Sequence, residues 1–379
     1  VLSFENELLR EKDARIAELE APQEGLEELG AEPPEAISPP QETFTVNDSL
    51  EDIIDLNGPI ARGVLTWVGQ RRPDFIEAWT NWKLLEEDLK PIYNEAGYPW
   101  ELGAAQKFQE SHVKAHAGSR RGAVGTDQFI RATGRKYGLR VVQGFDERQD
   151  PVKSTRAQIA YMQDLLKIFD GDYSLALAAY NGASAYRAAM RARRKNPKAT
   201  FWDREVYLSS RRETRDYVAL VLAAAMILRE PERFGFTEPA VDTRRAELEL
   251  ARDTTIDQLA FCLGDDPRAG SFGFFRALRN MNPQYSVKDT LPKGTTLTVP
   301  AVAKERYVEH CIGGAAVELA ARLHEHAFPE YETYRVRRGD TLQKIGRRYG
   351  VRWGDIAREN GIKKPYVIHP GDVLIIPQD

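Results

Sequence analysis

A glutamate followed by a glycine-rich segment is the feature of this sequence best suited to acid–base chemistry. Within residues 98–140, apolar residues at helical spacing lead up to Glu110, and three glycines follow between positions 118 and 125. A helix dipole places partial negative charge at the helix C-terminus, which raises the pKa of a carboxyl group there. A carboxyl group that keeps its proton near neutral pH can serve as a general acid. A glutamate at a helix end is also commonly a solvated surface residue, so this pattern alone leaves both interpretations open.

The residues around Glu110 match a larger pattern in order and spacing. Glu110-Ser111 is followed by Ser119 and Ala123, by the letters GTDQ that end at Gln128, and by TG and YGL within 133–139. The match continues with FDERQDPVKST (145–155), GDYSLALAAYN (171–181), FW (201–202) and RRETRDYV (211–218). This pattern resembles the lytic murein transglycosylases, which are bacterial enzymes with a goose-lysozyme-like fold. Together with the C-terminal module described below, the arrangement resembles the D-type membrane-bound members of that family.

The resemblance implies a reaction that uses one carboxyl group. In this family a glutamate protonates the glycosidic oxygen between N-acetylmuramic acid and N-acetylglucosamine. It then takes the proton of the muramic acid 6-hydroxyl, which attacks C1 and leaves a 1,6-anhydro sugar. The resemblance assigns this acid/base role to Glu110. The residues expected to bind saccharide or to position the glutamate are Ser111, Ser119, Asp127, Gln128, Tyr180 and Asn181.

Three places depart from the family pattern. Asp127 stands where relatives usually have Met or Trp, Lys107 stands where they have an apolar residue, and Gly182-Ala183 reverses the usual order after AYN. Asp127 could raise the pKa of Glu110 by repulsion, act as the second carboxylate of a hydrolase, point to solvent, or mark a weakened enzyme kept for binding. The unusual Lys107 also favours the hypothesis of a weakened enzyme that is kept for binding. Three functions therefore remain open: a transglycosylase, an inactive peptidoglycan-binding scaffold or docking protein, and a lysozyme-like muramidase with two carboxylates.

The C-terminal segment has the order strand, helix, helix, strand. YRVRRGDTLQKIGRRYGV, RWGDIARENGI and HPGDVLIIP supply these elements, and they resemble a LysM peptidoglycan-binding module. By this resemblance, one side of an N-acetylglucosamine groove is formed by Gly339, Asp340, Thr341 and Leu342, and Ile368 lies on the other side. Residues 334–377 carry 10 basic and 4 acidic side chains. This charge suits the carboxylates of peptidoglycan or is simply a solvated basic face, and no nucleic-acid motif accompanies it.

We expect a mainly α protein, with a lysozyme-like all-helical catalytic domain followed by small βααβ LysM modules. The first 20 residues repeat Leu2, Leu9 and Ile16 in heptads, which suits self-association or a protein partner. The expected segments are a helical leader (1–20), a Pro/Glu-rich linker (21–43), the transglycosylase domain (44–244), a degenerate LysM-like module without a clear first strand (245–301), a helical connector (302–331) and the LysM module (332–379).

Composition favours a globular protein, and the resemblance implies a location in the bacterial envelope. The 379 residues are 42% hydrophobic and 29% charged, and the longest apolar run, Val218 to Leu228, is too short to cross a bilayer. The chain starts at Val1 without an export signal, so we expect that signal to have been removed and the location to be the periplasm. Cys262 and Cys311 either pair or remain buried thiols. No zinc or calcium pattern occurs, so no metal or cofactor is expected.

Overall fold

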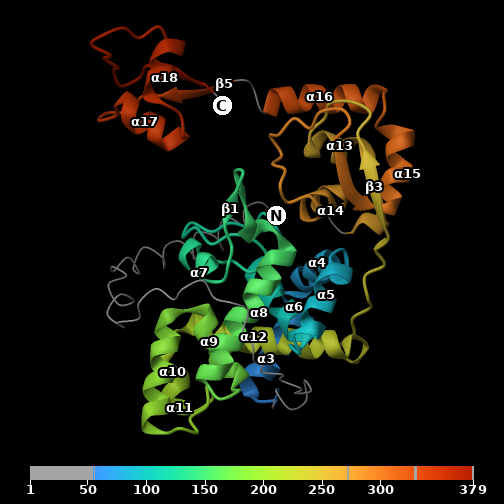
Figure 1. Ribbon diagram of the computed structural model, residues 1–379, viewed down its shortest axis with the longest axis vertical. Coiled ribbons are helices and arrows are strands. Elements are labelled where there is room, and N and C mark those ends of the chain that lie inside the picture. Colours follow the sequence, from blue (N-terminus) through green and yellow to red (C-terminus); the bar gives the residue numbers. More distant parts are fainter. Residues whose placement is uncertain (1–53, 55, 271–272, 328–330, 378–379) are drawn as a thin grey trace. The chain divides into compact units, whose positions relative to one another are not determined.

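The computed structural model describes residues 54, 56–270, 273–327 and 331–377 (Figure 1). The predicted leader (1–20) and linker (21–43) lie outside the described residues. The chain divides into two compact units, one ending at Val241 and one beginning at Asp242, and each is described here by itself. The described residues are predominantly helical, with short two-stranded sheets, which confirms the predicted fold class.

The first unit is a bundle of helices around one large hydrophobic core, with a smaller cluster of Phe129, Leu139 and Ala157 beside it. Its helices are α3 (Gly58–Val68), α4 (Arg72–Lys83), α5 (Glu86–Glu95), α6 (Trp100–Ser111), α7 (Arg131–Lys136), α8 (Pro151–Ile168), α9 (Tyr173–Asn181), α10 (Ala183–Lys195), α11 (Arg204–Ser209) and α12 (Arg212–Arg229). Two 3-10 turns, η1 (Glu147–Gln149) and η2 (Pro231–Phe234), and the hairpin of β1 (Val141–Val142) and β2 (Phe145–Asp146) complete the unit.

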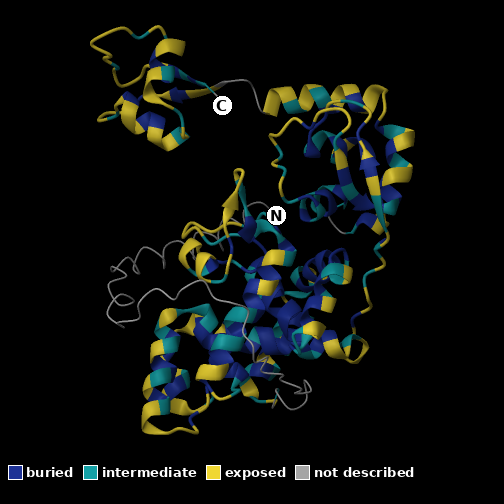
Figure 2. Cartoon of the chain, in the orientation of Figure 1, coloured by how far each residue is buried: buried dark blue, intermediate teal, exposed yellow. Residues whose placement is uncertain are grey.

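Helix α12 is the centre of this bundle and packs against α3, α6 and α9. Its residues from Val218 to Leu228 are mostly buried, as the apolar run predicts, and Figure 2 shows the buried residues concentrated where these helices meet. On α6, Gly103 permits close packing, because a Cβ there would lie 2.2 Å from the ring of Tyr93 on α5. The helix that carries Glu110 is therefore fixed between α12 and α5.

The helices that flank the site begin at side-chain caps. Asp150 accepts hydrogen bonds from the backbone N–H groups of Val152 and Lys153 at the start of α8, and Asp172 accepts one from Leu175 at the start of α9. The sequence predicted one buried helix through 173–190, but the chain breaks at Gly182 into α9 and α10. Gly182 has φ −177, an extended conformation that any residue adopts, so the reversed Gly182-Ala183 order makes no special demand on the backbone.

The second unit contains two βααβ modules, each with its own hydrophobic core. The first module contains β3 (Arg245–Glu249), α13 (Ile256–Leu263), the 3-10 turn η3 (Pro267–Ala269), α14 (Gly273–Met281), β4 (Thr296–Pro300), α15 (Ala301–His310) and α16 (Ala315–Ala327). The second contains β5 (Tyr331–Arg335), α17 (Leu342–Tyr349), α18 (Trp353–Glu359) and β6 (Val373–Pro377). In each module the two strands pair in antiparallel register.

The first of these modules differs from its prediction in two ways, and it settles one open alternative. A complete first strand is present, since β3 pairs with β4 from Arg245 opposite Pro300 to Glu249 opposite Thr296. The expected connector at 302–331 is wrong for α15 and α16, because their apolar residues lie in the module's core. Cys262 and Cys311 form a disulfide that joins α13 to the end of α15. Spacing in the sequence could not choose between paired and free thiols, because the pairing depends on how α15 folds back.

Candidate active site and glycan-binding module

Glu110 occupies the last turn of α6, as predicted from the apolar pattern. Its carboxyl group is partly buried and faces two tyrosines, Tyr180 at the end of α9 and Tyr217 on α12. Burial, and then the nearby carboxylates, raise the pKa of both phenols well above the ordinary value; Glu110 acts on both, and Asp127 also acts on Tyr180. Both phenols therefore keep their protons at neutral pH, so the glutamate is surrounded by neutral hydrogen-bond donors rather than by solvent alone.

The loop after Glu110 is held at its start by helix α4. Asn81 donates a hydrogen bond of 2.8 Å to the backbone oxygen of His112, which has a left-handed φ of 52°. Glu77 contacts the His112 ring at 3.2 Å and the Lys114 ammonium at 2.6 Å. Burial would raise the pKa of Glu77, but the hydrogen bonds from His112 and Lys114 outweigh it and lower that pKa. The chain thus leaves α6 in one defined direction.

Gly125 and Arg148 fix the middle of the same loop. Gly125 has φ +88 and its backbone passes so close to η1 that a Cβ would lie 1.7 Å from the Arg148 carbonyl oxygen. The Arg148 guanidinium donates to the carbonyl oxygens of Gly122 and Phe129 at 2.7 and 2.8 Å, and Asp146 holds its other nitrogens. One buried arginine therefore ties two carbonyl oxygens of the loop to η1.

We expect Gly125→Ala to be far more damaging than Gly122→Ala. Both glycines have positive φ, but the space around a Gly122 Cβ is open. Gly122→Ala should therefore lower the free energy of unfolding only through the strain of a left-handed alanine, by about 1–2 kcal/mol. Gly125→Ala adds a clash with the backbone and should lower it by roughly 3 kcal/mol or more. Urea unfolding followed by tryptophan fluorescence measures this difference, because five of the six tryptophans lie in the first unit. Equal losses in the two variants would contradict this account of the loop.

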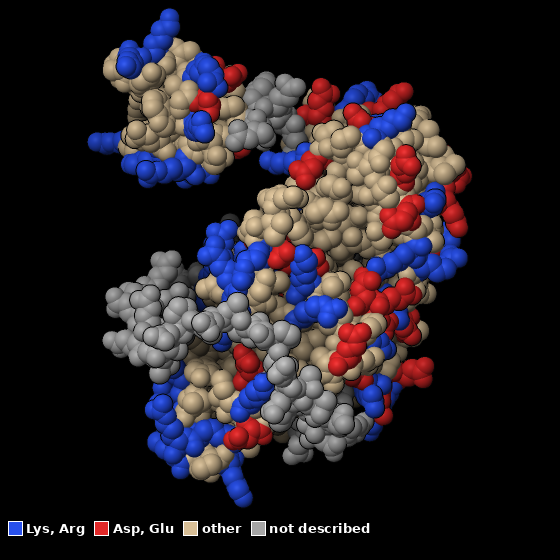
Figure 3. All heavy atoms as spheres, viewed as in Figure 1, with Lys and Arg blue, Asp and Glu red and all other residues tan. Residues whose placement is uncertain are grey.

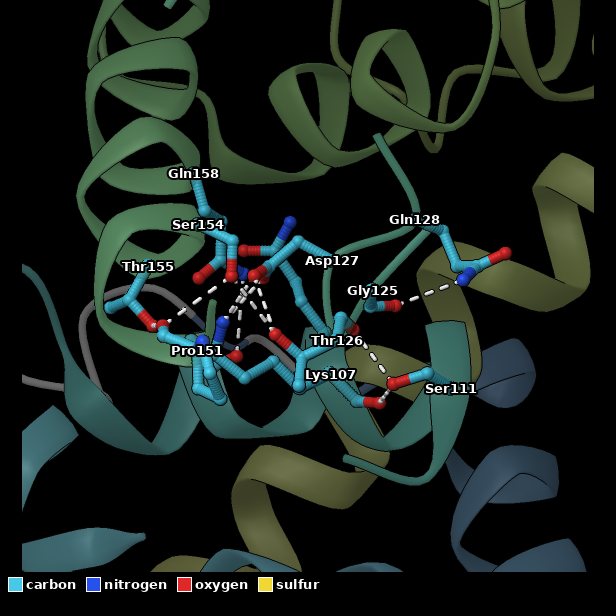
Figure 4. Close-up of polar contacts among 12 residues, drawn as sticks. Lys107, Ser111, Gly125, Thr126, Asp127, Gln128, Pro151, Ser154, Thr155 and Gln158 are labelled. Atoms are coloured by element: carbon cyan, nitrogen blue, oxygen red, sulfur yellow. Dashed lines mark hydrogen bonds and ion pairs between the residues drawn. The ribbon is translucent and has the colours of Figure 1, made fainter. Parts of the chain in front are cut away.

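Lys107 and Asp127 form an ion pair beside the catalytic turn (Figure 4). The Lys107 Nζ lies 2.5 and 2.6 Å from the two Asp127 carboxylate oxygens, and both side chains have no exposed surface. Thr126 donates to the same carboxylate at 2.9 Å and its hydroxyl also meets Ser154 on α8 at 3.1 Å. The alternative in which Asp127 points to solvent is wrong. Its direct contact with saccharide is also contradicted, because both oxygens are buried and engaged.

Other predicted site residues hold the loop onto the bundle. The Ser111 hydroxyl donates to the backbone oxygen of Thr126 at 2.8 Å, and the Tyr180 hydroxyl donates to the backbone oxygen of Asp127 at 3.0 Å. Gln128, with φ 50, donates from its amide nitrogen to the carbonyl oxygens of Ala117 and Gly125, and its amide oxygen points away from these contacts (Figure 4). The helix expected to start at Gln128 begins instead at Arg131, because the left-handed residue delays it.

The remaining two predicted residues lie at opposite ends of the site. Ser119 is exposed, and its hydroxyl accepts a hydrogen bond of 3.0 Å from the backbone N–H of Ala123 within the loop turn. Asn181 accepts a bond of 2.8 Å from the Thr214 hydroxyl on α12, which fixes the side chain at the end of α9. The structure therefore brings Glu110, Ser111, Tyr180 and the 126–128 segment together through direct contacts. Asn181 adjoins Tyr180 in sequence, whereas the Ser119 hydroxyl makes its hydrogen bond within the turn of the loop.

Sequence reasoning did not single out Arg148 and Tyr217 as site residues. Arg148 lies inside FDERQDPVKST and Tyr217 inside RRETRDYV, two stretches that belong to the pattern of matching residues. Their position within these matching stretches could have marked both residues as candidates for the site. Their roles required the fold, because Arg148 acts through carbonyls 26 and 19 residues away and Tyr217 approaches Glu110 from α12.

The C-terminal module presents its predicted groove residues on adjacent loops. Thr341 caps α17 by accepting from the Lys344 N–H, and Asp340 accepts from the Arg337 N–H and the Tyr334 hydroxyl, each at 2.7 Å. Gly339 and Thr341 are exposed, Asp340 and Ile368 are partly buried, and Leu342 packs in the core. Within this module, no backbone hydrogen bond joins residues 337–342 to residues 363–370. Basic side chains predominate on the face shown in Figure 3.

The two βααβ modules share one internal network. Asn360 donates to the carbonyl oxygens of Ile356 and Ile375 and accepts from the Ile375 N–H, and Asn282 makes the same three contacts with Leu278 and Thr298. These asparagines tie the second helix of each module to its last strand. The first module therefore has the same framework as the second.

The loops that correspond to the groove are joined in the first module. Thr254 and Leu291 exchange two backbone hydrogen bonds of 3.0 and 2.7 Å, and the Leu291 side chain is buried. The end of α16 also reaches the start of α13, where His324 meets Asp257 at 2.8 Å. The corresponding loops of the C-terminal module have no such backbone hydrogen bonds between them.

Two kinds of feature are absent from the described residues. No helix among them has the length and apolar character needed to span a bilayer. No three or more His, Cys, Asp or Glu side chains among them are grouped as metal ligands.

The site and modules agree with two domain families. Residues 94–202 match the transglycosylase SLT domain and residues 334–377 match the LysM domain. The chain therefore carries an SLT domain, which contains Glu110 and the loop around Asp127, followed by a LysM domain, and it is a homologue of the lytic murein transglycosylases.

Individual relatives agree with this classification. The chain is 32% identical over 278 residues to membrane-bound lytic murein transglycosylase D of Escherichia coli, a match that covers 70% of this chain and 58% of that protein. It is 30% identical over 176 residues to a peptidoglycan transglycosylase of an Escherichia phage, covering 45% of this chain and 13% of that protein. Among solved structures, an inactive mutant of the lytic transglycosylase Slt from Pseudomonas aeruginosa is 25% identical, with a TM-score of 0.32, and the match covers 39% of this chain and 24% of that one. The chain thus spans just over half of the E. coli relative.

Proposed function

We propose that this protein is a lytic transglycosylase that cleaves the β-1,4 bond between N-acetylmuramic acid and N-acetylglucosamine in peptidoglycan. The observation that carries the proposal is the placement of Glu110. It ends α6 of an SLT domain, partly buried against two protonated tyrosines. The relatives named as murein or peptidoglycan transglycosylases support the substrate class and, with the LysM domain, a location in the bacterial envelope.

In the proposed reaction Glu110 acts first as an acid and then as a base. Its proton passes to the glycosidic oxygen as the bond from that oxygen to C1 breaks. The muramic acid 6-hydroxyl then forms the new bond to C1 while its proton returns to Glu110, so no water is consumed. The attacking hydroxyl belongs to the same sugar, which gives the step the advantage of an intramolecular reaction. Tyr217, which is protonated and lies beside Glu110, would stabilise the carboxylate between the two steps, whereas the Tyr180 hydroxyl already donates to the backbone oxygen of Asp127.

The two alternative functions are weakened by the Lys107–Asp127 pair. A muramidase of the two-carboxylate type needs a second carboxylate free to act across the bond, and Asp127 is buried and bound to an ammonium. An inactive scaffold was suggested by the unusual residues at 107 and 127. Because the charges of Lys107 and Asp127 pair with each other, neither is buried alone, and the contacts between the helix and the loop around Glu110 are kept.

We infer that anchoring to glycan belongs to residues 332–379. In the C-terminal module no backbone hydrogen bond joins the two groove loops, whereas backbone hydrogen bonds between Thr254 and Leu291 join the corresponding loops of the first module. We therefore interpret residues 242–327 as a module of LysM type whose groove is closed. Self-association or partner binding through residues 1–20 stays a prediction from the sequence.

Digestion of purified sacculi followed by mass analysis of the released muropeptides tests the proposed reaction. The proposal expects products with 1,6-anhydro ends. Reducing ends would indicate a muramidase, and no release under conditions where a known relative is active would indicate a scaffold.

A further inference from the structure

The buried pair of Lys107 and Asp127 lies next to the carboxyl group that does the proposed chemistry. Lys107 is three residues before Glu110 on α6, so the two side chains share one face of the helix. Asp127 comes from the loop, 20 residues along the chain. The ammonium contacts both carboxylate oxygens, and both side chains are fully inaccessible to solvent.

The pair and its loop also connect three of the helices that surround the catalytic turn, α6, α8 and α9. Through Asp127 it fixes the loop, whose backbone is held further by Ser111 from α6 and Tyr180 from α9. Through Thr126 it reaches Ser154 on α8 (Figure 4). An apolar pair could fill the same space, but it would not direct the loop through hydrogen bonds.

We propose that Lys107 and Asp127 are positioning residues for Glu110, which fix the loop against α6 and, because their charges cancel, set the pH range in which Glu110 holds its proton. This inference rests on the proposed function of Glu110. The charge on each partner matters because the site is buried, where Coulomb interactions are screened less than in water.

The titratable groups around this pair are few. Glu110 and Lys107 lie on α6, Asp127 on the loop, Tyr180 on α9, Tyr217 on α12, and Tyr93 on α5. Burial lowers the pKa of Lys107, while Asp127 and Glu110 act in the opposite direction. By reciprocity, the Lys107 ammonium favours ionised Glu110 and the Asp127 carboxylate disfavours it. The three phenols are neutral, so among these groups Lys107 and Asp127 carry the charges whose loss would shift the pKa of Glu110.

Single substitutions should therefore move Glu110 in opposite directions. Asp127→Asn leaves the ammonium uncompensated, so the pKa of Glu110 should fall by about one unit, at the lower end of the range for one nearby charge. Lys107→Met removes the ammonium, so the pKa of Glu110 should rise by about one unit. Lys107→Met combined with Asp127→Leu removes both charges and should return the midpoint to the wild-type value.

The experiment measures this midpoint in two ways on the full chain. Carbon NMR of glutamate labelled at its carboxyl group follows Glu110 directly, with Glu110→Gln as the assignment reference. The pH dependence of turnover on soluble glycan fragments follows the same group, because activity falls when Glu110 loses its proton. The NMR titration does not require turnover, so an inactive protein would count against the proposed function without deciding the role of the pair.

Shifts in opposite directions for the two single variants, with a wild-type midpoint in the double variant, would support the proposal. A merely structural pair would lower the melting temperature in both single variants and leave the midpoint where it was, and that result overturns it. If one single variant fails to fold, the other single variant decides: a midpoint equal to that of the wild type overturns the proposal, and a shift of about one unit in the expected direction supports it.

Discussion

Glu110→Gln should abolish nearly all turnover on peptidoglycan while leaving the fold intact. The amide keeps the size and hydrogen bonding of the carboxyl group, but it has no acidic proton to give to the glycosidic oxygen. A positioned proton-transfer group typically contributes about a hundredfold or more in rate, and we expect a loss of at least that size. Release of soluble muropeptides from sacculi measures this effect. Because Glu110 is partly exposed at a helix end, the melting temperature should change little.

Glu95→Gln is the matched control for that experiment. Glu95 is the last residue of helix α5, as Glu110 is in the last turn of α6, and Glu95 is exposed. The substitution removes the same charge from the same kind of position, outside the site, so it should leave turnover unchanged. Substantial activity in Glu110→Gln, or an equal loss in Glu95→Gln, would contradict the role assigned to Glu110.

Removal of the C-terminal LysM domain should have the second large effect, on binding rather than on chemistry. A chain that ends at residue 331 should bind insoluble sacculi at least about tenfold more weakly, which corresponds to roughly 1.4 kcal/mol. Turnover on soluble glycan fragments should be retained, because Glu110 and its loop lie in the first unit. Sedimentation with sacculi, followed by quantification of the protein in the pellet, measures the difference.

The isolated modules provide the control for this prediction. Residues 332–379 contain a complete hydrophobic core and should sediment with sacculi when expressed alone. Residues 242–327 have a core of their own but joined loops, so they should stay in the supernatant. If residues 242–327 sediment to the same extent as residues 332–379, the assignment of the groove is refuted.

The local elements of the site could be predicted from the sequence. The apolar spacing before Glu110 predicted the helix that ends there, because helix periodicity is a property of neighbouring residues. The turn and helix around Thr341 were predicted for the same reason, from a capping residue followed by an apolar pattern. In both places the relevant information lies within a few positions along the chain.

The contacts between distant residues could not be predicted in the same way. Lys107 and Asp127 looked like two separate departures that weakened the site, and only the fold shows that they neutralise each other. A substitution of Asp127 alone by an apolar residue, which the family pattern favours, would leave a buried ammonium without a partner. The Cys262–Cys311 disulfide depends on the return of α15 in the same way.

The sharpest test of the central claim is a digestion of sacculi in water labelled with heavy oxygen. If the muramic acid 6-hydroxyl is the nucleophile, the new ends carry no label and each is lighter by one water than a reducing end. The control is a muramidase digestion in the same water, which must introduce the label. We predict unlabelled 1,6-anhydro ends from this protein, and their loss in Glu110→Gln. Labelled reducing ends would contradict the account, because they require water to attack C1.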